Sequence, residues 1–166
     1  MAQWIWYPGD FEFFLGLNVI PLRTERGIVI TPNWRMENFY NNVKFCKEFV
    51  LEKDACIKIH STGTQCVTLD YGWYSHYDPD EGLFVSKGRH VIWVHVFNRL
   101  QLPSIYIECP GVETDDSWMV TCDNVIWKPV GSWNFTDVKR PPTSFRLETT
   151  HIEPVTITAM DSGILY

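Results

Sequence analysis

The sequence lacks the short motifs that are typical of common catalytic and nucleotide-binding sites. It contains neither a GxGxxG nor a GxxxxGK loop, which excludes the two phosphate-binding loops that these patterns encode. A GxSxG sequence is also absent, which argues against the nucleophile elbow of α/β-hydrolases. No CxxC pair occurs, so the closely spaced ligand pairs of a zinc site are missing.

The cysteines are few and form an odd set. We expect them to be buried thiols that pack as small hydrophobic side chains. One or two disulfides are the alternative, and only for an exported domain. The five residues are Cys46, Cys56, Cys66, Cys109 and Cys122.

Long apolar runs and basic clusters are missing as well. No uncharged apolar stretch reaches the roughly 18–20 residues that span a bilayer. The first basic residue is Arg23, and Pro8 to Glu12 interrupt the apolar start of the chain, so a signal peptide is not indicated. The formal charge of −6 argues against nucleic-acid and anionic-membrane partners. We expect a soluble protein, with a cytoplasmic or a periplasmic location left open.

What the sequence does contain favours strands. Its 166 residues predict a single domain over 1–166, and the 15% aromatic content includes eight tryptophans. Ten prolines and ten glycines suit short strands joined by many turns. The recurrence of strands and turn signals predicts an all-β fold, a sandwich or a barrel.

Two-residue alternation predicts where these strands lie. "ACIKIHSTG" and "CVTLDYG" each place two apolar residues on one face. "SIYIEC" is expected to bury Ile105 and Ile107 while Tyr106 and Glu108 face outward, and "VTITAM" repeats the pattern near the end of the chain. "HVIWVHVFN" is apolar on both faces, which predicts a central strand covered on both sides.

Helices are not predicted, because no segment shows a convincing i, i+3, i+4 apolar stripe. "NWRMENFYNNV" is interpreted as a loop or one turn of helix, and "VKRPPTSFRL" as a connection to a last strand. In the opening "MAQWIWYPGDFEFF", Trp4, Trp6 and Tyr7 are expected to form an entering strand that packs on the sandwich. Pro8, Gly9 and Asp10 would then turn the chain.

Histidine and carboxylate clusters offer little for catalysis. His90 and His95 are five apart on a strand, so their side chains face opposite sides and cannot share a metal. The clusters "YDPDEG" and "ETDDSW" are interpreted as solvated turns. A catalytic dyad between the Asp78 and Asp115 regions and a calcium ion on Asp78 and Asp80 are the alternatives. We predict no catalytic residue, no metal and no cofactor.

The aromatic loop "DYGWYSHYDPD" is the stretch best suited to binding a ligand. Aromatic faces stack on sugar rings, and nearby carboxylates accept hydrogen bonds from sugar hydroxyls. The alternative is that its aromatic residues fill the core. The candidate ligand-binding residues are Trp73, Tyr74, Tyr77, Asp78 and Asp80.

Several stretches together resemble one family, the bacterial α-L-rhamnosidases, which are glycoside hydrolases. The similar stretches are "AQWIWYPGDFE", "VKFCKEFVLEKDACIKIHSTG", "LFVSKGRHVIWVHVFNRLQLPSIYIEC", "ETDDSWMVT" and "PPTSFRLETT…SGILY". The resemblance is to the N-terminal β-sandwich of these enzymes and covers nearly the whole chain. It implies the fold class that we predict, an all-β antiparallel β-sandwich of jelly-roll type. One departure is Asp70-Tyr71-Gly72, where related jelly rolls often carry an Asn-Gly turn.

The resemblance implies a function that the residues alone do not supply. It implies a non-catalytic accessory domain, an excised N-terminal part of a larger inverting enzyme, whose partners are the catalytic and other domains of the same chain. In that family the general acid lies on a later helical domain, so no catalytic residue is carried over. The domain would brace the catalytic domain, with a place beside the substrate site as a further option. The alternative is a module that itself binds rhamnose-containing glycans.

Overall fold

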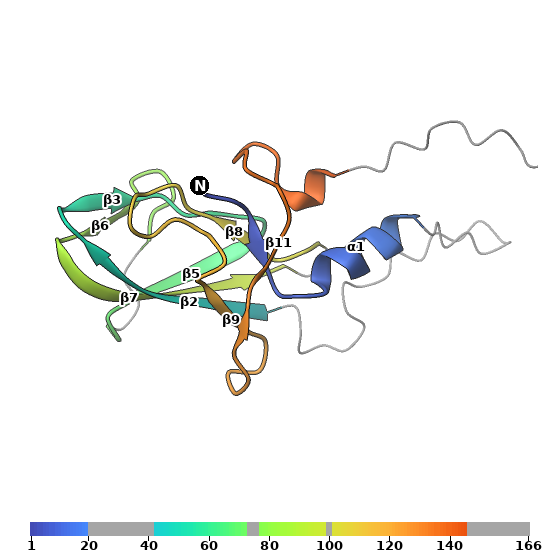
Figure 1. Cartoon of the computed structure of the whole chain (residues 1–166), viewed down its shortest axis with the longest axis horizontal. Coiled ribbons are helices and arrows are strands. Elements are labelled where there is room, and N and C mark those ends of the chain that lie inside the picture. The colour runs from blue at the N-terminus through green and yellow to red at the C-terminus, as the bar shows by residue number, and fades with distance from the viewer. Residues whose placement is uncertain (20–41, 73–76, 99–100, 146–166) are drawn as a thin grey trace, which may run out of the picture.

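The computed structural model describes residues 1–19, 42–72, 77–98 and 101–145 (Figure 1). Within these residues the chain is nearly all β, with one α-helix and one short 3-10 helix. The elements are β1 (Ile5–Trp6), α1 (Asp10–Val19), β2 (Asn42–Leu51), β3 (Ala55–Ile57), β4 (His60–Ser61), β5 (Thr64–Leu69), β6 (Leu83–Val85), β7 (Gly88–Phe97), β8 (Ser104–Tyr106), β9 (Met119–Thr121), β10 (Lys128–Pro129), β11 (Gly131–Ser132) and the 3-10 helix η1 (Pro142–Ser144).

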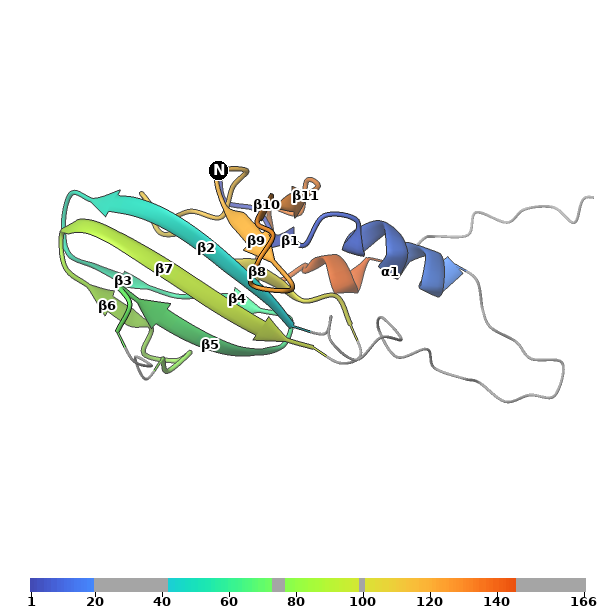
Figure 2. The ribbon, with the colours of Figure 1, turned by 90° about the horizontal axis from the view of Figure 1, so that it is seen from below.

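The strands form antiparallel sheets. A five-stranded sheet has the order β10-β9-β2-β7-β5, a four-stranded sheet has the order β11-β1-β8-β4, and β3 pairs with β6. The two long strands β2 and β7 pair along their whole length and form the curved layer seen in Figure 2. The predicted all-β antiparallel sandwich is confirmed, whereas its jelly-roll connectivity stays a prediction.

The inner face of the five-stranded sheet carries the main core. Phe45 of β2 lies opposite Val94 of β7, and Val94 lies opposite Val67 of β5. All three side chains are buried, as are Ile5 and Ile105 of the other sheet, which belong to the same apolar cluster. The alternation predicted for these strands is confirmed, because β-branched side chains at every second position fill the space between two pleated sheets.

The four-stranded sheet is covered on its second face too. Trp4, Trp6 and Tyr106 face away from the main core and are buried in a second cluster with Phe11 and Phe14 of α1. The prediction that Tyr106 faces outward is therefore wrong, because this second cluster removes its ring from water. Its hydroxyl donates to the carbonyl oxygen of Thr136 at 3.2 Å, which satisfies the buried donor.

β7 is a central strand, but only one of its faces is covered. Ile92, Val94 and Val96 are fully buried on the inner face. On the outer face His95 is exposed and Phe97 is 45% exposed. The prediction of cover on both sides is wrong among the described residues, because an antiparallel sheet can keep one face toward water even when that face carries apolar residues.

The opening stretch begins as predicted and then differs. Ile5 and Trp6 form β1, and the chain turns at Pro8 and Gly9, where Gly9 has a φ of 89°. The residues that follow form α1, which the sequence did not predict. Its apolar residues are not gathered on one face of the helix, so the sequence shows no amphipathic periodicity. Asp10 and Glu12 in the first turn complement the helix dipole.

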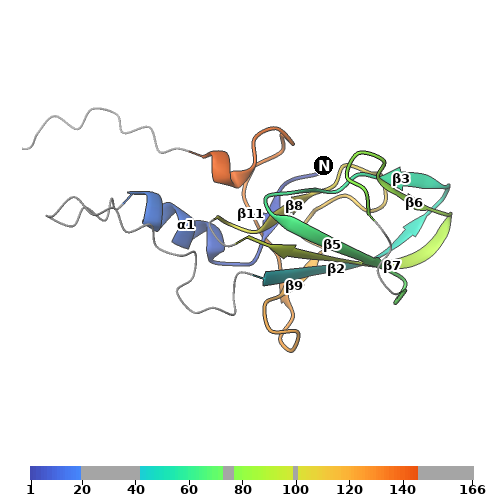
Figure 3. The same ribbon diagram turned by 180° about the vertical axis from the view of Figure 1, so that it is seen from behind.

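Three other predicted segments lie wholly or partly outside the described residues. "VTITAM" and all but the last two residues of "NWRMENFYNNV" are outside them, and "VKRPPTSFRL" is described only as far as Phe145. Of the described elements, α1 and η1 lie at one end of the molecule, and β3 and β6 lie at the other (Figure 3).

Candidate functional site

The predicted aromatic loop is described in part. Trp73 and Tyr74 lie outside the described residues. The hydroxyl of Tyr77 accepts a hydrogen bond from the Ile59 amide at 2.7 Å and donates one to the Ile59 carbonyl at 3.0 Å. Its ring packs against the main core, and burial raises the pKa of the phenol. Tyr77 therefore ties the end of the loop to the chain between β3 and β4.

The two carboxylates of this loop face water. Asp78 accepts the amide of Asp80 at 2.8 Å through its side chain and the amide of Gly82 at 2.7 Å through its carbonyl. These bonds close a turn around Pro79, as expected where an Asp side chain caps its own backbone. Both carboxylates are exposed, so they remain available to a ligand.

The start of the loop carries a pair of aromatic rings in contact, one of which is exposed. Tyr71 is 78% exposed, and its ring centroid lies 4.6 Å from that of Trp93 on the outer face of β7. Asp70 and Tyr71 have φ values of 51° and 59°. Since this left-handed conformation is unfavourable for side chains other than Gly, Asn and Asp, the turn that presents the Tyr71 ring is strained.

An imidazole and a carboxylate fix this turn to β7. His90 Nδ1 lies 2.6 Å from Asp70 Oδ2, and His90 Nε2 lies 2.8 Å from the carbonyl oxygen of Ser86. Both neighbours are acceptors, so both ring nitrogens can donate only in the protonated imidazole, and this arrangement favours that form. The hydrogen bond to Asp70 raises the pKa of His90. Burial alone would raise the pKa of Asp70, but the hydrogen bond to His90 lowers it below its ordinary value.

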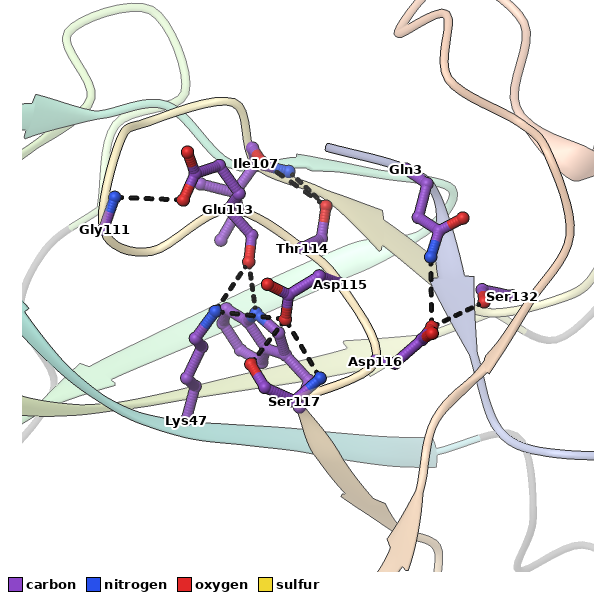
Figure 4. Close-up of polar contacts among 11 residues, drawn as sticks. Gln3, Lys47, Ile107, Gly111, Glu113, Thr114, Asp115, Asp116, Ser117 and Ser132 are labelled. Atoms are coloured by element: carbon purple, nitrogen blue, oxygen red, sulfur yellow. Dashed lines mark hydrogen bonds and ion pairs between the residues drawn. The ribbon is translucent and has the colours of Figure 1, made fainter. Parts of the chain in front are cut away.

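The "ETDDSW" segment forms an internal polar network around a buried lysine (Figure 4). Lys47 Nζ donates to the Glu113 carbonyl at 2.9 Å and lies 3.2 Å from Asp115 Oδ1. The Lys47 side chain is only 11% exposed and lies 5.8 Å from the centroid of the Trp118 ring. Burial works to raise the pKa of Asp115, but hydrogen bonds from Ser117 and Lys47 hold it below its ordinary value.

The remaining side chains of this segment connect separate strands. Thr114 Oγ1 accepts the Ile107 amide at 3.1 Å, and Glu113 Oε2 accepts the Gly111 amide at 3.0 Å. Asp116 accepts bonds from Gln3 at 3.1 Å and from Ser132 at 2.9 Å, next to β1 and on β11 (Figure 4). The carboxylates thus stabilise turns and strand contacts, in agreement with the turn interpretation of the sequence.

A cleft of about 510 Å³ opens beside β4 and β5, close to the aromatic loop. Its volume falls within the roughly 300–1,000 Å³ of small-molecule sites. Part of its lining is apolar and comes from distant segments of the chain: Trp4, Ile59, Pro79, Val138 and Pro141. Pro79 is the residue that connects the cleft to the predicted aromatic loop.

The rest of the cleft lining is polar and, apart from one histidine, non-ionisable. These residues are His60, Ser61, Thr62, Gly63, Gln65, Gln101 and Thr143. Gln65 Nε2 donates to the Ile59 carbonyl at 3.2 Å, but its buried Oε1 has no hydrogen-bonding partner among the described residues. A buried acceptor without a donor costs about 1–3 kcal/mol, so this atom requires an explanation.

One wall of the cleft is held by hydrogen bonds through Thr62. Its amide donates to the Ser104 carbonyl at 3.1 Å, and its Oγ1 donates to the Leu102 carbonyl at 2.5 Å while accepting the Ser104 amide at 2.9 Å. At Gly63 a Cβ would collide with the carbonyl of Phe97, so only glycine fits there. These contacts fix the turn between β4 and β5 in one conformation.

Neither Lys47 nor Gln65 was singled out from the sequence. Lys47 occupies an inner-face position of β2 between Phe45 and Phe49, and Gln65 occupies one of β5, two residues before Val67. A polar residue in the apolar register of a predicted strand is the signal that could have found both, since it must be paired where it is buried.

The five cysteines are all described and none forms a disulfide. Four are half-buried and Cys56 is exposed, so the expectation of buried thiols is wrong for Cys56. Burial raises the pKa of Cys46 and of Cys109, which lowers the reactivity of these two thiols.

Metal and membrane features were also searched in the part of the chain that the structure describes. There, no group of three or more His, Cys, Asp and Glu side chains could hold a metal ion. None of the described helices has the length and apolar character needed to span a bilayer.

Together these observations define an antiparallel β-sandwich domain stabilised by an internal polar network, with a cleft beside β4 and β5 that is lined by polar and apolar residues. The family model described as "Alpha-rhamnosidase-like, bacteroidetes, N-terminal" matches residues 43–166, which is most of the chain. The chain belongs to this family of N-terminal domains. A search of curated proteins gives no match.

Proposed function

We propose that this domain is a non-catalytic accessory domain that braces the catalytic domain of an α-L-rhamnosidase-like glycoside hydrolase. The observation that carries the proposal is the network in Figure 4. Asp115 and Asp116 belong to one of the two carboxylate clusters considered for a catalytic dyad. Both accept hydrogen bonds from other residues of the domain. A glycosidase needs two carboxyl groups facing each other across a substrate, which internal hydrogen bonding of this kind does not favour.

An exposed aromatic surface supports the bracing role. Trp133 is 56% exposed and packs against Phe11, Phe135 and Phe145. Beside it a second cleft of about 700 Å³ is lined by residues between Asn134 and Phe145, including Lys139 and Arg140. Interfaces between domains of one chain combine apolar and polar surface in this way. We propose that this surface contacts the following domains, with a place beside the substrate site as a finer possibility.

Hydrolysis of an aryl α-L-rhamnoside by the isolated chain tests the non-catalytic role. The expected result is no turnover above buffer. Turnover that is lost in Asp115→Asn or in Asp78→Asn would overturn the proposal and favour a self-contained hydrolase.

The bracing surface is tested by Trp133→Ala in the longer protein that the proposal assumes, with Val125→Ala as the control. Val125 is also an exposed apolar residue, but it lies on the loop between β9 and β10. We expect Trp133→Ala to lower the midpoint of thermal denaturation of the longer protein more than that of the isolated chain, and Val125→Ala to change neither. Equal shifts in both proteins would show that Trp133 acts only within the domain.

A second candidate function is binding of rhamnose-type sugars by the aromatic loop. It is favoured by the exposed Tyr71 ring and by the exposed carboxylates of Asp78 and Asp80. Of the residues predicted for it, Tyr77 would support the loop through Ile59, and Trp73 and Tyr74 would provide the stacking faces. Calorimetric titration of the chain with L-rhamnose, with and without calcium, tests this candidate, and heat that is lost in Trp73→Ala is the expected result.

A further inference from the structure

We propose that the cleft beside β4 and β5 is a binding site for a neutral, hydroxyl-rich ligand, in chemical class a monosaccharide or the end of an oligosaccharide. The proposal is independent of the bracing role, because a domain can support its neighbours with this cleft occupied or empty. It also differs from the aromatic-loop candidate, since Pro79 is the one described residue of that loop that lines the cleft.

The charge of the cleft limits what it can hold. Of the described residues that line it, none is Asp, Glu, Lys or Arg. An anion would find no cationic partner there, and a metal ion would find no carboxylate ligand. Asp78 and Asp80 flank Pro79 outside the cleft and would repel a negatively charged ligand.

The hydrogen-bonding groups of the cleft suit hydroxyls. Gln65 lines the cleft, and its buried Oε1 has no donor among the described residues, so a ligand hydroxyl that reaches this atom from the cleft would supply one. The ring nitrogens of His60 form no hydrogen bond with any described residue, so one can donate and the other accept. A hydroxyl group both donates and accepts, whereas a purely apolar ligand would leave Gln65 Oε1 unpaired.

The apolar part of the cleft suits the carbon face of a sugar ring. The indole N–H of Trp4 is already bound to the Asp137 carbonyl at 3.1 Å, so this side chain offers ring atoms rather than a donor. Pro79 and Pro141 add rigid apolar surface from two other segments. Small-molecule sites combine such surface with a few fixed polar groups.

The cleft is also preorganised. Thr62 is bonded to the chain on either side of Pro103, and Gln65 is held through its Nε2 to Ile59. A ligand would therefore meet polar groups that are already ordered, which lowers the entropic cost of binding.

NMR titration of the chain tests the proposal, with L-rhamnose and D-galactose as neutral probes and D-glucuronate as the anionic probe. With at least one neutral probe we expect saturable shifts of the Thr62 and Gln65 amides and of the Trp4 indole N–H. D-Glucuronate should bind more weakly than the neutral probe, because none of the described residues that line the cleft is a cation. Saturable shifts centred on residues 70–82 would instead assign binding to the aromatic loop and overturn this proposal, as would the absence of saturable shifts with every probe.

Variants locate the site. Gln65→Leu removes the unpaired acceptor and should weaken binding about tenfold or more. His60→Ala should weaken it as well, and because this side chain is exposed the variant should remain folded. The matched control is Thr64→Ala, an exposed neighbour whose side chain lies on the opposite face of β5. Equal affinity of wild type, His60→Ala and Gln65→Leu would overturn the proposal.

Discussion

The two faces of the four-stranded sheet are packed in different ways. On one face Ile5 and Ile105 join an aliphatic core that also contains Val94 of the opposite sheet. On the other face Trp6 joins a cluster of aromatic rings that includes Phe11 of α1. The aliphatic core is built from side chains at every second position of paired strands. The aromatic cluster combines Trp6 and Tyr106 of the paired strands β1 and β8 with residues of α1 and of segments outside the sheets.

The difference teaches which kind of packing a sequence reveals. Alternation along paired strands fixes the aliphatic core locally, because one residue of slip would turn every side chain to the other face. The aromatic cluster depends on contacts between residues more than a hundred positions apart, such as Trp6 and Phe135 with centroids 5.9 Å apart. No local pattern specifies such contacts.

The largest effect is expected in the aliphatic core. Phe45→Ala removes a side chain with no exposed surface and leaves a cavity between the sheets, which should lower the free energy of unfolding by about 3–5 kcal/mol. Urea denaturation followed by far-UV circular dichroism measures the loss. Thr64→Ala, an exposed substitution on β5, is the control and should stay within about 0.5 kcal/mol of wild type.

Phe11→Ala gives the comparison its sharpest test. Phe11 contacts four rings with centroids 5.1–6.0 Å away, so its loss should open the aromatic cluster locally. We expect faster hydrogen exchange at the Trp4 amide, which donates to Phe135, and little change at Val94. If Phe11→Ala and Phe45→Ala accelerate exchange equally at both amides, the two regions are one cooperative unit and the distinction fails.

The same distinction explains what could be predicted. The fold class and the inner faces of β5 and β7 followed from alternation, since Val67 and Val94 repeat the period of a pleated strand. Tyr106 and α1 were mispredicted because both depend on the aromatic cluster, whose partners are remote in sequence. The cleft could not be predicted, because Trp4, Gln65 and Val138 converge only in the folded chain.

A smaller effect is expected at Lys47, a charged residue on the inner face of the five-stranded sheet. Asp115→Ala leaves the Lys47 ammonium, whose side chain is 11% exposed, without its carboxylate, although the Glu113 carbonyl remains as an acceptor. The free energy of unfolding should fall by about 1.5–3 kcal/mol, because a charged donor loses one of its two acceptors. Chemical denaturation measures the change.

Lys47→Met separates the role of charge from that of packing. It keeps the length of the apolar stem on the inner face, next to Trp118, and removes the buried charge. We expect it to cost less than Asp115→Ala, and the double variant to be more stable than Asp115→Ala alone. A double variant that is as unstable as the sum of the two single changes would show that the pair does not couple.

The smallest effect is the dependence of stability on pH. It arises at the start of β7, at the end of the molecule that lies far from α1 (Figure 2). The pKa of His90 is raised above its ordinary value of 6.5, so its stabilising contribution is full below pH 6.5 and is lost as pH rises through the raised value. The pKa of Asp70 is lowered from 3.8, so its contribution is present above pH 3.8 and is lost as pH falls through the lowered value. The His90–Asp70 pair therefore stabilises the fold most between pH 3.8 and pH 6.5.

The measurement is the free energy of unfolding of wild type and of His90→Gln from acidic to alkaline pH. The loss of stability caused by His90→Gln should be largest between pH 3.8 and pH 6.5 and should shrink at alkaline pH. Asp70→Asn should lose the same pH-dependent part, because its side-chain oxygen can still accept the Val91 amide while the charge is gone. A deficit of His90→Gln that is constant with pH would show that the imidazole acts by packing against Phe49, whose ring centroid lies 5.7 Å away, rather than by its charge.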